Sequence, residues 1–186
     1  EFSPQIMSNL LWSFAKLNIE DADLFHDIAR KAVVHIREFN PQGLSNLAWS
    51  SAKLRVDDPE LFSAVVAGFL GQAHELKPQE LSNAVWALAS LSMNNGNLFR
   101  AFAQQAAIRL KESAPQGISN LAWGFATLGI VDSALFNALA KESMVKVSAF
   151  KPQGLSNLAW AFATHGLAYP ELFLSIAEEV VAKASD

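Results

Sequence analysis

The string Pro-Gln-x-x-Ser-Asn-x-x-Trp occurs five times in this chain, and each copy begins 37 residues after the previous one. The copies start at Pro4, Pro41, Pro78, Pro115 and Pro152. A fixed period of roughly 20 to 50 residues is typical of an array in which one small structural unit stacks on the next. Five units of 37 residues account for nearly all of the 186 residues. The period therefore predicts the architecture of the whole chain.

Each unit is expected to begin with a helix, and we number its residues from the proline as position 1. Proline suits the first turn because no amide hydrogen is needed there, and Asn40 is a good N-cap before Pro41. Apolar residues at positions 4, 7, 8 and 11 follow helical spacing. Residues suited to a left-handed C-cap follow this first helix in three copies, at Asn18, Gly129 and Gly166.

A second helix is expected after a short turn in every unit. Its N-cap is an Asp or Asn in four copies, and it opens with Leu-Phe in all five. A pair of such helices cannot bury its apolar faces alone, so the units must stack. The sequence thus predicts an all-α fold, a right-handed α-solenoid of five 37-residue helix-turn-helix repeats, with the handedness taken by analogy with other helical arrays. The repeats cover about 3–39, 40–76, 77–113, 114–150 and 151–186 as a single array.

Composition narrows the function classes. The chain has no cysteine, which excludes disulfides and thiol chemistry. Its apolar runs are too short to span a bilayer, and its four histidines fall at different positions of the unit, so we expect no metal site. No catalytic pattern occurs at a defensible spacing. We therefore expect neither an enzyme nor a cofactor. Because neither end looks like a polar cap, we expect a part of a longer protein.

The first helices carry a polar face opposite their apolar stripe. Position 2 is Gln and position 6 is Asn in every copy, whereas position 13 varies among Lys, Ser and Thr. Most charges fall on the second helices, which we therefore assign to a solvated convex face. The predicted binding residues of the concave face are Gln5, Asn9, Lys16, Gln42, Asn46, Lys53, Gln79, Asn83, Ser90, Gln116, Asn120, Thr127, Gln153, Asn157 and Thr164.

Two linear ligands suit this uncharged ladder. Single-stranded RNA can be read by two or three side chains per helical repeat, here at positions 3, 6, 10 and 13. Lys77 and Lys151 precede first helices, where phosphate groups are favoured. An extended peptide is the other ligand, since amides can hydrogen-bond its backbone. The net charge of −4 is unlike that of a generic nucleic-acid binder, but local charge on one face matters more than the sum.

Two residue types at fixed positions have structural interpretations as well. The tryptophan at position 9 could form a base-stacking platform, but we place it on the flank of the wheel and interpret it as a joint against the neighbouring first helix. The asparagine at position 6 could bind ligand or bond the adjacent unit. The serine at position 5 is interpreted as a small packing residue.

The fourth copy, from Pro115 to Phe136, shows the pattern Pro-Gln-Gly-x-Ser-Asn-Leu-Ala-Trp-x-x-Ala-x-Leu-Gly followed by Leu-Phe. This pattern resembles the octotricopeptide repeat and is similar to the related heptatricopeptide repeat, over essentially the whole chain. The resemblance implies an organellar protein, of the mitochondrion or chloroplast, that binds RNA and acts in its processing, stability or translation. It also implies an alternative, since some such proteins are structural parts of organellar ribosomes.

The leading hypothesis is therefore an organellar helical-repeat protein that binds single-stranded RNA along its concave face. The alternative is a protein–protein scaffold, such as a structural subunit of an organellar ribosome or another large assembly, with protein partners. We expect no membrane and no metal among the partners of either.

Overall fold

The structure is a computed structural model that describes residues 2–184. Within that range the chain forms ten α-helices and three short 3-10 helices, and it contains no strand. The all-α prediction is therefore confirmed for the described residues. The first helices all begin at the repeated proline, and they are α1 (Pro4–Leu17), α3 (Pro41–Lys53), α5 (Pro78–Ser90), α7 (Pro115–Thr127) and α9 (Pro152–Thr164).

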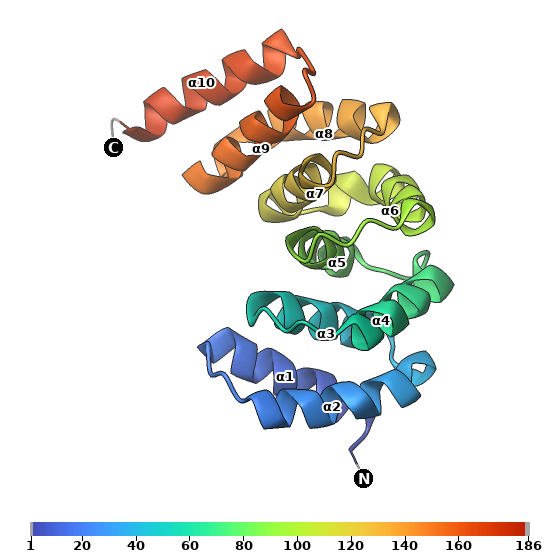
Figure 1. Cartoon of the computed structure of the whole chain (residues 1–186). Helices are drawn as coiled ribbons and strands as arrows, with labels where there is room; N and C mark the ends of the chain where they lie inside the picture. The colour runs from blue at the N-terminus through green and yellow to red at the C-terminus, as the bar shows by residue number, and fades with distance from the viewer. Residues whose placement is uncertain (1, 185–186) are drawn as a thin grey trace.

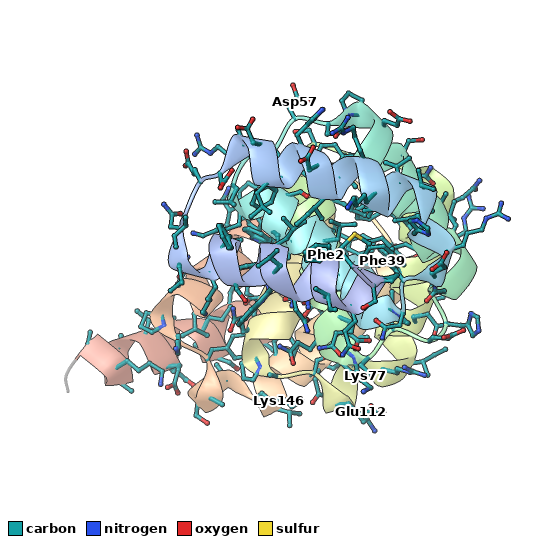
Figure 2. The ribbon with its side chains drawn as sticks, turned by 90° about the horizontal axis from the view of Figure 1, so that it is seen from below. Phe2, Phe39, Asp57, Lys77, Glu112 and Lys146 are labelled. Atoms are coloured by element: carbon teal, nitrogen blue, oxygen red, sulfur yellow. The ribbon has the colours of Figure 1, made fainter. Side chains whose placement is uncertain are left out.

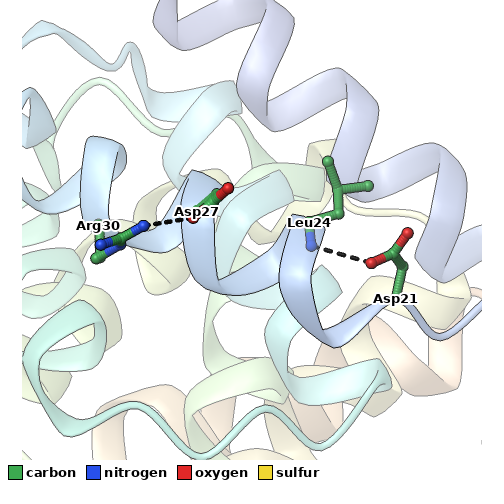
Figure 3. Close-up of polar contacts among 4 residues, drawn as sticks. All are labelled: Asp21, Leu24, Asp27 and Arg30. Carbon is green, nitrogen blue, oxygen red and sulfur yellow. Dashed lines mark hydrogen bonds and ion pairs between the residues drawn. The ribbon is translucent and has the colours of Figure 1, made fainter.

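The second helices begin where the sequence places an Asp or Asn cap. The Asp21 carboxylate accepts a hydrogen bond from the Leu24 amide at 3.0 Å (Figure 3), and Asp58, Asn95 and Asp132 make the same contact. These predicted N-caps are confirmed, and each satisfies an amide that the first turn leaves without a partner. The second helices are α2 (Ala22–Val34), α4 (Pro59–Gln72), α6 (Gly96–Arg109), α8 (Ser133–Val145) and α10 (Pro170–Ala184).

In every unit, the residue at position 15, where the first helix ends, adopts the left-handed backbone conformation. Asn18, Gly129 and Gly166 have φ angles of 56°, 69° and 63°, which confirms the predicted C-caps. The other two units hold Arg55 and Ser92 in the same conformation, with φ angles of 53° and 56°. Side chains with a Cβ rarely adopt it, so the turn is imposed by the surrounding fold in these two units.

The helices pack on their neighbours along the chain, and first helices pack against first helices more closely than second helices pack against each other. This difference curves the array, with α1, α3, α5, α7 and α9 on its inner side. Figure 1 shows the pairs rising in chain order from α1 to α10 between the two termini. A solenoid is compatible with this packing, and its division into five units and its right-handed sense stay predictions.

One hydrophobic core runs through the described helices. It contains the apolar stripe of the first helices, where positions 4, 7, 8 and 11 are buried or half-buried in all five copies. The Leu-Phe pair that opens each second helix joins the same core, as at Leu98 and Phe99, both fully buried. The predicted burial pattern is therefore confirmed, and it leaves the opposite side of each first helix free.

The connections between units are 3-10 turns at three of the four joints, η1 (Ile36–Glu38), η2 (Leu110–Glu112) and η3 (Val147–Ala149). Backbone carbonyls of the connections accept hydrogen bonds from side chains at the end of the following second helix. Arg109 Nη1 donates to the Leu76 carbonyl at 2.8 Å, and Lys146 Nζ donates to the Ser113 carbonyl at 2.8 Å. Figure 2 shows Lys77, Glu112 and Lys146 along one edge of the molecule and Asp57, in an intra-unit turn, at the opposite edge. The two edges bound the inner face of the array.

Candidate functional site

The predicted amide ladder lies on the inner side of the array. The glutamines at position 2 are exposed in all five units, and so are the residues at position 13. Asn9 is exposed, and the other four asparagines at position 6 are half-buried. These residues share one side of each helix because their spacings of 4, 7 and 11 residues are close to whole helical turns. The ladder is thus accessible, and it is not sealed between units. Its amides are Gln5, Gln42, Gln79, Gln116 and Gln153, with Asn9, Asn46, Asn83, Asn120 and Asn157.

The side-chain amides of this ladder have no protein partners. Among residues 2–184, no hydrogen bond joins any of the ten amide groups to another residue, although the backbone carbonyls of Asn9 and Asn46 accept from Ser13 and Ser50. None of the half-buried asparagines has a buried polar side-chain atom without a partner, so their amides are reached by solvent. An unpaired row of donors and acceptors on one face is therefore equipped to bind an external polar ligand.

A continuous hollow of about 520 Å³ crosses four of the first helices. Trp49 and Lys53 line it from the C-terminal half of α3, and Asn83 and Trp86 line it from the middle of α5. The N-terminal halves of α7 and α9 complete the opposite end. The hollow brings together seven of the predicted residues: Lys53, Asn83, Gln116, Asn120, Lys151, Gln153 and Asn157.

The hollow runs obliquely across the helices. Moving from α3 to α9, the contributing positions shift from 9 and 13 toward 2 and 6. A straight ligand would therefore meet a different part of each first helix, instead of the same positions in every unit.

The remaining predicted residues lie outside this hollow. Ser90 lines a second hollow of about 650 Å³ together with Lys53, Trp86 and Trp123. Lys77 is exposed, and its backbone amide donates to the Glu80 carboxylate at 2.8 Å. The others are exposed or half-buried on the same side of their helices: Gln5, Asn9, Lys16, Gln42, Asn46, Gln79, Thr127 and Thr164.

Position 10 is not a ligand-reading position, which corrects the expectation from the sequence. It is buried in four of five units, at Ser50, Ala87, Gly124 and Ala161. At Gly124 an added Cβ would lie 2.5 Å from Val85 Cγ1, so the backbone of α7 approaches α5 at this point. Position 3 also turns toward the preceding unit, since a Cβ on Gly117 would lie 3.2 Å from Ser82 Oγ. Both positions belong to the joint between first helices.

The serine at position 5 packs in the same joints. It is buried in the first four units, and Ser45 Oγ donates to the Glu80 carbonyl of the next first helix at 3.0 Å. Its interpretation as a small packing residue is confirmed in those four units.

The tryptophans at position 9, considered as a stacking platform but left out of the predicted binding residues, take part both in the joints and in the inner face. Their rings contact the neighbouring first helix, with centroids 6.4 Å apart for Trp12 and Trp49 and 6.5 Å apart for Trp86 and Trp123. The rings are nevertheless exposed or half-buried, and Trp49 and Trp86 line the hollow beside the amides. The interpretation of the tryptophan as a joint against the neighbouring first helix is confirmed for these two pairs. Position 9 follows position 6 by three residues and precedes position 13 by four, which is the spacing of one helical face.

The charge of the inner face differs in sign from that of the chain. The five first helices contain two lysines, Lys16 and Lys53, and one acidic residue, Glu80. Lys77 and Lys151 add two more positive charges at helix starts, whereas the chain as a whole has a net charge of −4. The inner face is therefore mildly positive on a protein that is otherwise acidic, which favours an anionic ligand there.

Neither a metal-binding cluster nor a membrane-spanning helix occurs among residues 2–184. No three or more His, Cys, Asp or Glu side chains gather where they could hold a metal ion. None of the described helices combines the length and the apolarity that crossing a bilayer requires.

Comparison with known protein families gives a match over the length of the chain. Residues 1–186 match the family described as RNA-editing substrate-binding complex 6 protein. No curated protein matches the chain. The matched family differs in name from the octotricopeptide and heptatricopeptide families, and membership of those stays a prediction.

Proposed function

The chain belongs to the RNA-editing substrate-binding complex 6 protein family, and from this premise we propose that it binds single-stranded RNA along the inner face of its first helices. It acts as a binding subunit of an assembly that holds RNA for editing, and not as an enzyme. The family description names both an RNA process and a complex, which supports RNA and protein as the two classes of partner.

The observation that carries this proposal is the row of ten side-chain amides without protein partners. An amide offers both a donor and an acceptor, so it matches the edges of bases and the 2′-hydroxyl groups of RNA. Helical-repeat proteins read unpaired bases with such side chains. An elongated hollow lined by amides suits a linear polymer better than a compact small molecule.

Electrostatics supports the same ligand. Lys53 and Lys151 line opposite ends of the hollow, and Lys16 and Lys77 lie on the same side of the array. Each phosphate neutralised on a single strand contributes roughly −0.7 to the slope of log affinity against log salt. Four lysines therefore limit that slope to about −3, so binding should depend on salt only moderately.

The proposed compartment is the mitochondrion. Complexes for RNA editing act there, and the family description names such a complex. The chloroplast, the other compartment that the repeat pattern implied, gains no support from the family.

A pair of substitutions tests the amide ladder. We expect the variant Gln116→Ala with Asn120→Ala, both in the hollow, to bind a labelled single-stranded RNA roughly tenfold more weakly, because each lost hydrogen bond contributes about 0.5–1.5 kcal/mol. The measurement is fluorescence anisotropy with RNA homopolymers at two salt concentrations.

The matched control is Asn97→Ala with Gln104→Ala, which removes the same two residue types from exposed positions of α6. This control should bind as the unmodified chain does. Absence of binding to every homopolymer at low salt would reject the proposal, and so would an equal loss in both double variants.

A scaffold function has one observation in its favour. Val34, Ile108 and Val145 occupy the same position of the second helices α2, α6 and α8, where α4 has Gly71, and they are 77%, 75% and 78% exposed. Apolar side chains that repeat in register on an outer surface are suited to a protein partner. If this function holds, a protein should co-purify after nuclease treatment and be lost in Ile108→Asp with Val145→Asp. If the double variant still retained the partner protein, these apolar side chains could not be its binding surface.

A further inference from the structure

The hollow of the inner face is bounded by aromatic rings as well as amides. Trp49 on α3 and Trp86 on α5 both line it, although they come from neighbouring first helices. We propose that these two rings bind nucleobases by stacking, so that bases stack at the α3–α5 end of the hollow, whereas the α7–α9 end binds the strand by hydrogen bonds without stacking. This inference rests on the proposed function and names the part of RNA that the tryptophans recognise.

The pairing of the rings supports this assignment. Trp49 contacts Trp12 on one side, with the two planes inclined at 36°, and Trp86 contacts Trp123 with an inclination of 32°. Each of the two central rings is thus held by a partner in the adjacent unit. Both rings are half-buried. The partner ring therefore holds each of them in place, and a part of its surface remains accessible in the hollow.

A base is the ligand that fits these groups best. Stacking on an aromatic side chain contributes about 1–3 kcal/mol per base and tolerates every base, since each base has a flat π-face. Asn83 lies one helical turn before Trp86 and lines the same hollow, where its amide can meet the edge of a stacked base. Lys53, one turn after Trp49, supplies a positive charge for the adjoining phosphate.

The oblique course of the hollow separates the two kinds of contact. The tryptophans contribute from α3 and α5, whereas Gln116, Asn120 and Asn157 contribute from α7 and α9, where no tryptophan lines the hollow. Along one strand, the nucleotides over α3 and α5 would be held by stacking, and those over α7 and α9 by hydrogen bonds. Loss of a base should therefore matter most at the α3–α5 end.

The test compares ordinary RNA with an oligonucleotide of the same length that lacks bases at successive positions. With the unmodified chain, we expect abasic sites at one end of the bound segment to weaken binding at least about fivefold, the lower limit of one stack. The variants Trp49→Leu and Trp86→Leu should lower affinity for ordinary RNA by a similar factor. They should have little further effect on the oligonucleotide that already lacks the stacked base.

Trp160→Leu is the matched control, because this ring is 46% exposed on α9 and does not line the hollow. Trp86→Phe, which keeps an aromatic face, should retain most of the affinity that the unmodified chain has for ordinary RNA. Circular dichroism melting checks that each variant is folded, and the comparison of the two RNAs on the unmodified chain needs no variant at all.

The outcomes separate this inference from the function on which it rests. If the unmodified chain binds no RNA, both are overturned. If it binds ordinary and abasic RNA equally well, RNA binding stands and base stacking is overturned. If Trp86→Leu weakens both RNAs equally, the ring acts through the fold or on another ligand class, such as an extended peptide, and the stacking assignment is again overturned.

Discussion

At the scale of single residues, the joints between first helices depend on matched side-chain size. Position 8 of one unit meets position 10 of the next, where Val85 meets Gly124. By the same register Ala48 is paired with Ala87, and Ala122 with Ala161, all buried. The joint thus holds either two alanines or, where one side carries the larger valine, a glycine on the other. This close approach brings the first helices together and so curves the array toward its inner face.

Gly124→Ala should destabilise the protein by about 1–3 kcal/mol, because the new Cβ would overlap Val85 Cγ1 and lie 3.1 Å from the Val85 carbonyl. Adding Val85→Ala should recover much of that loss, since the pair would then match the Ala–Ala joints of the other units. Urea unfolding of the single and double variants measures both effects.

Gly71→Ala is the control for helix propensity. Nothing lies within 4 Å of a Cβ at this exposed position of α4, so alanine should be neutral or stabilising there by up to about 1 kcal/mol. Equal unfolding free energies for Gly124→Ala and the unmodified chain would contradict the tight joint.

At the scale of elements, each second helix after the first is tied back to the preceding connection by a side chain at position 32. Gln72, Arg109, Lys146 and Lys183 each donate to a carbonyl about one unit earlier, at 2.7–3.0 Å. These carbonyls lie within or directly after 3-10 or irregular turns, where backbone acceptors lack the regular partners of an α-helix. The contacts therefore fix the angle between successive helical pairs.

Lys146→Met should cost about 1–3 kcal/mol of unfolding free energy. Lys146 Nζ donates to the carbonyls of Lys111 and Ser113, and it pairs with the half-buried Glu142 at 2.8 Å. Removing the ammonium group leaves these acceptors unsatisfied. Lys141→Met, at an exposed position of α8 just before it, should be nearly neutral. Equal melting temperatures for the two variants would contradict a stabilising role of the contacts between Lys146 and the preceding connection.

The elements also show which features a sequence can predict. The caps at Asp21, Asp58, Asn95 and Asp132 were predictable because one residue type at a fixed offset determines the contact. The ties at position 32 were not, because His, Gln, Arg and Lys occupy that position. Gln72, Arg109, Lys146 and Lys183 share only their reach toward the preceding connection, and that reach depends on the packing of two separate units.

At the scale of the whole molecule, the 37-residue period predicted the stacked helices and the accessible amides at positions 2 and 6, which are exposed at position 2 and mostly half-buried at position 6. A helical wheel describes the faces of one helix, and it does so reliably when the helix is regular. It says nothing of how each first helix is displaced relative to the next. The oblique hollow and the burial of position 10 arise from that displacement.

The most direct test of the central claim is a map of where RNA touches the protein. Single-stranded RNAs carrying one photo-activated thio-substituted base, placed at successive positions, are crosslinked to the chain, and the modified residues are identified by mass spectrometry. The account predicts crosslinks on α3, α5, α7 and α9 that move in order between Trp49 and Asn157 as the base moves along the strand. Crosslinks concentrated on the second helices, or scattered without order, would contradict it.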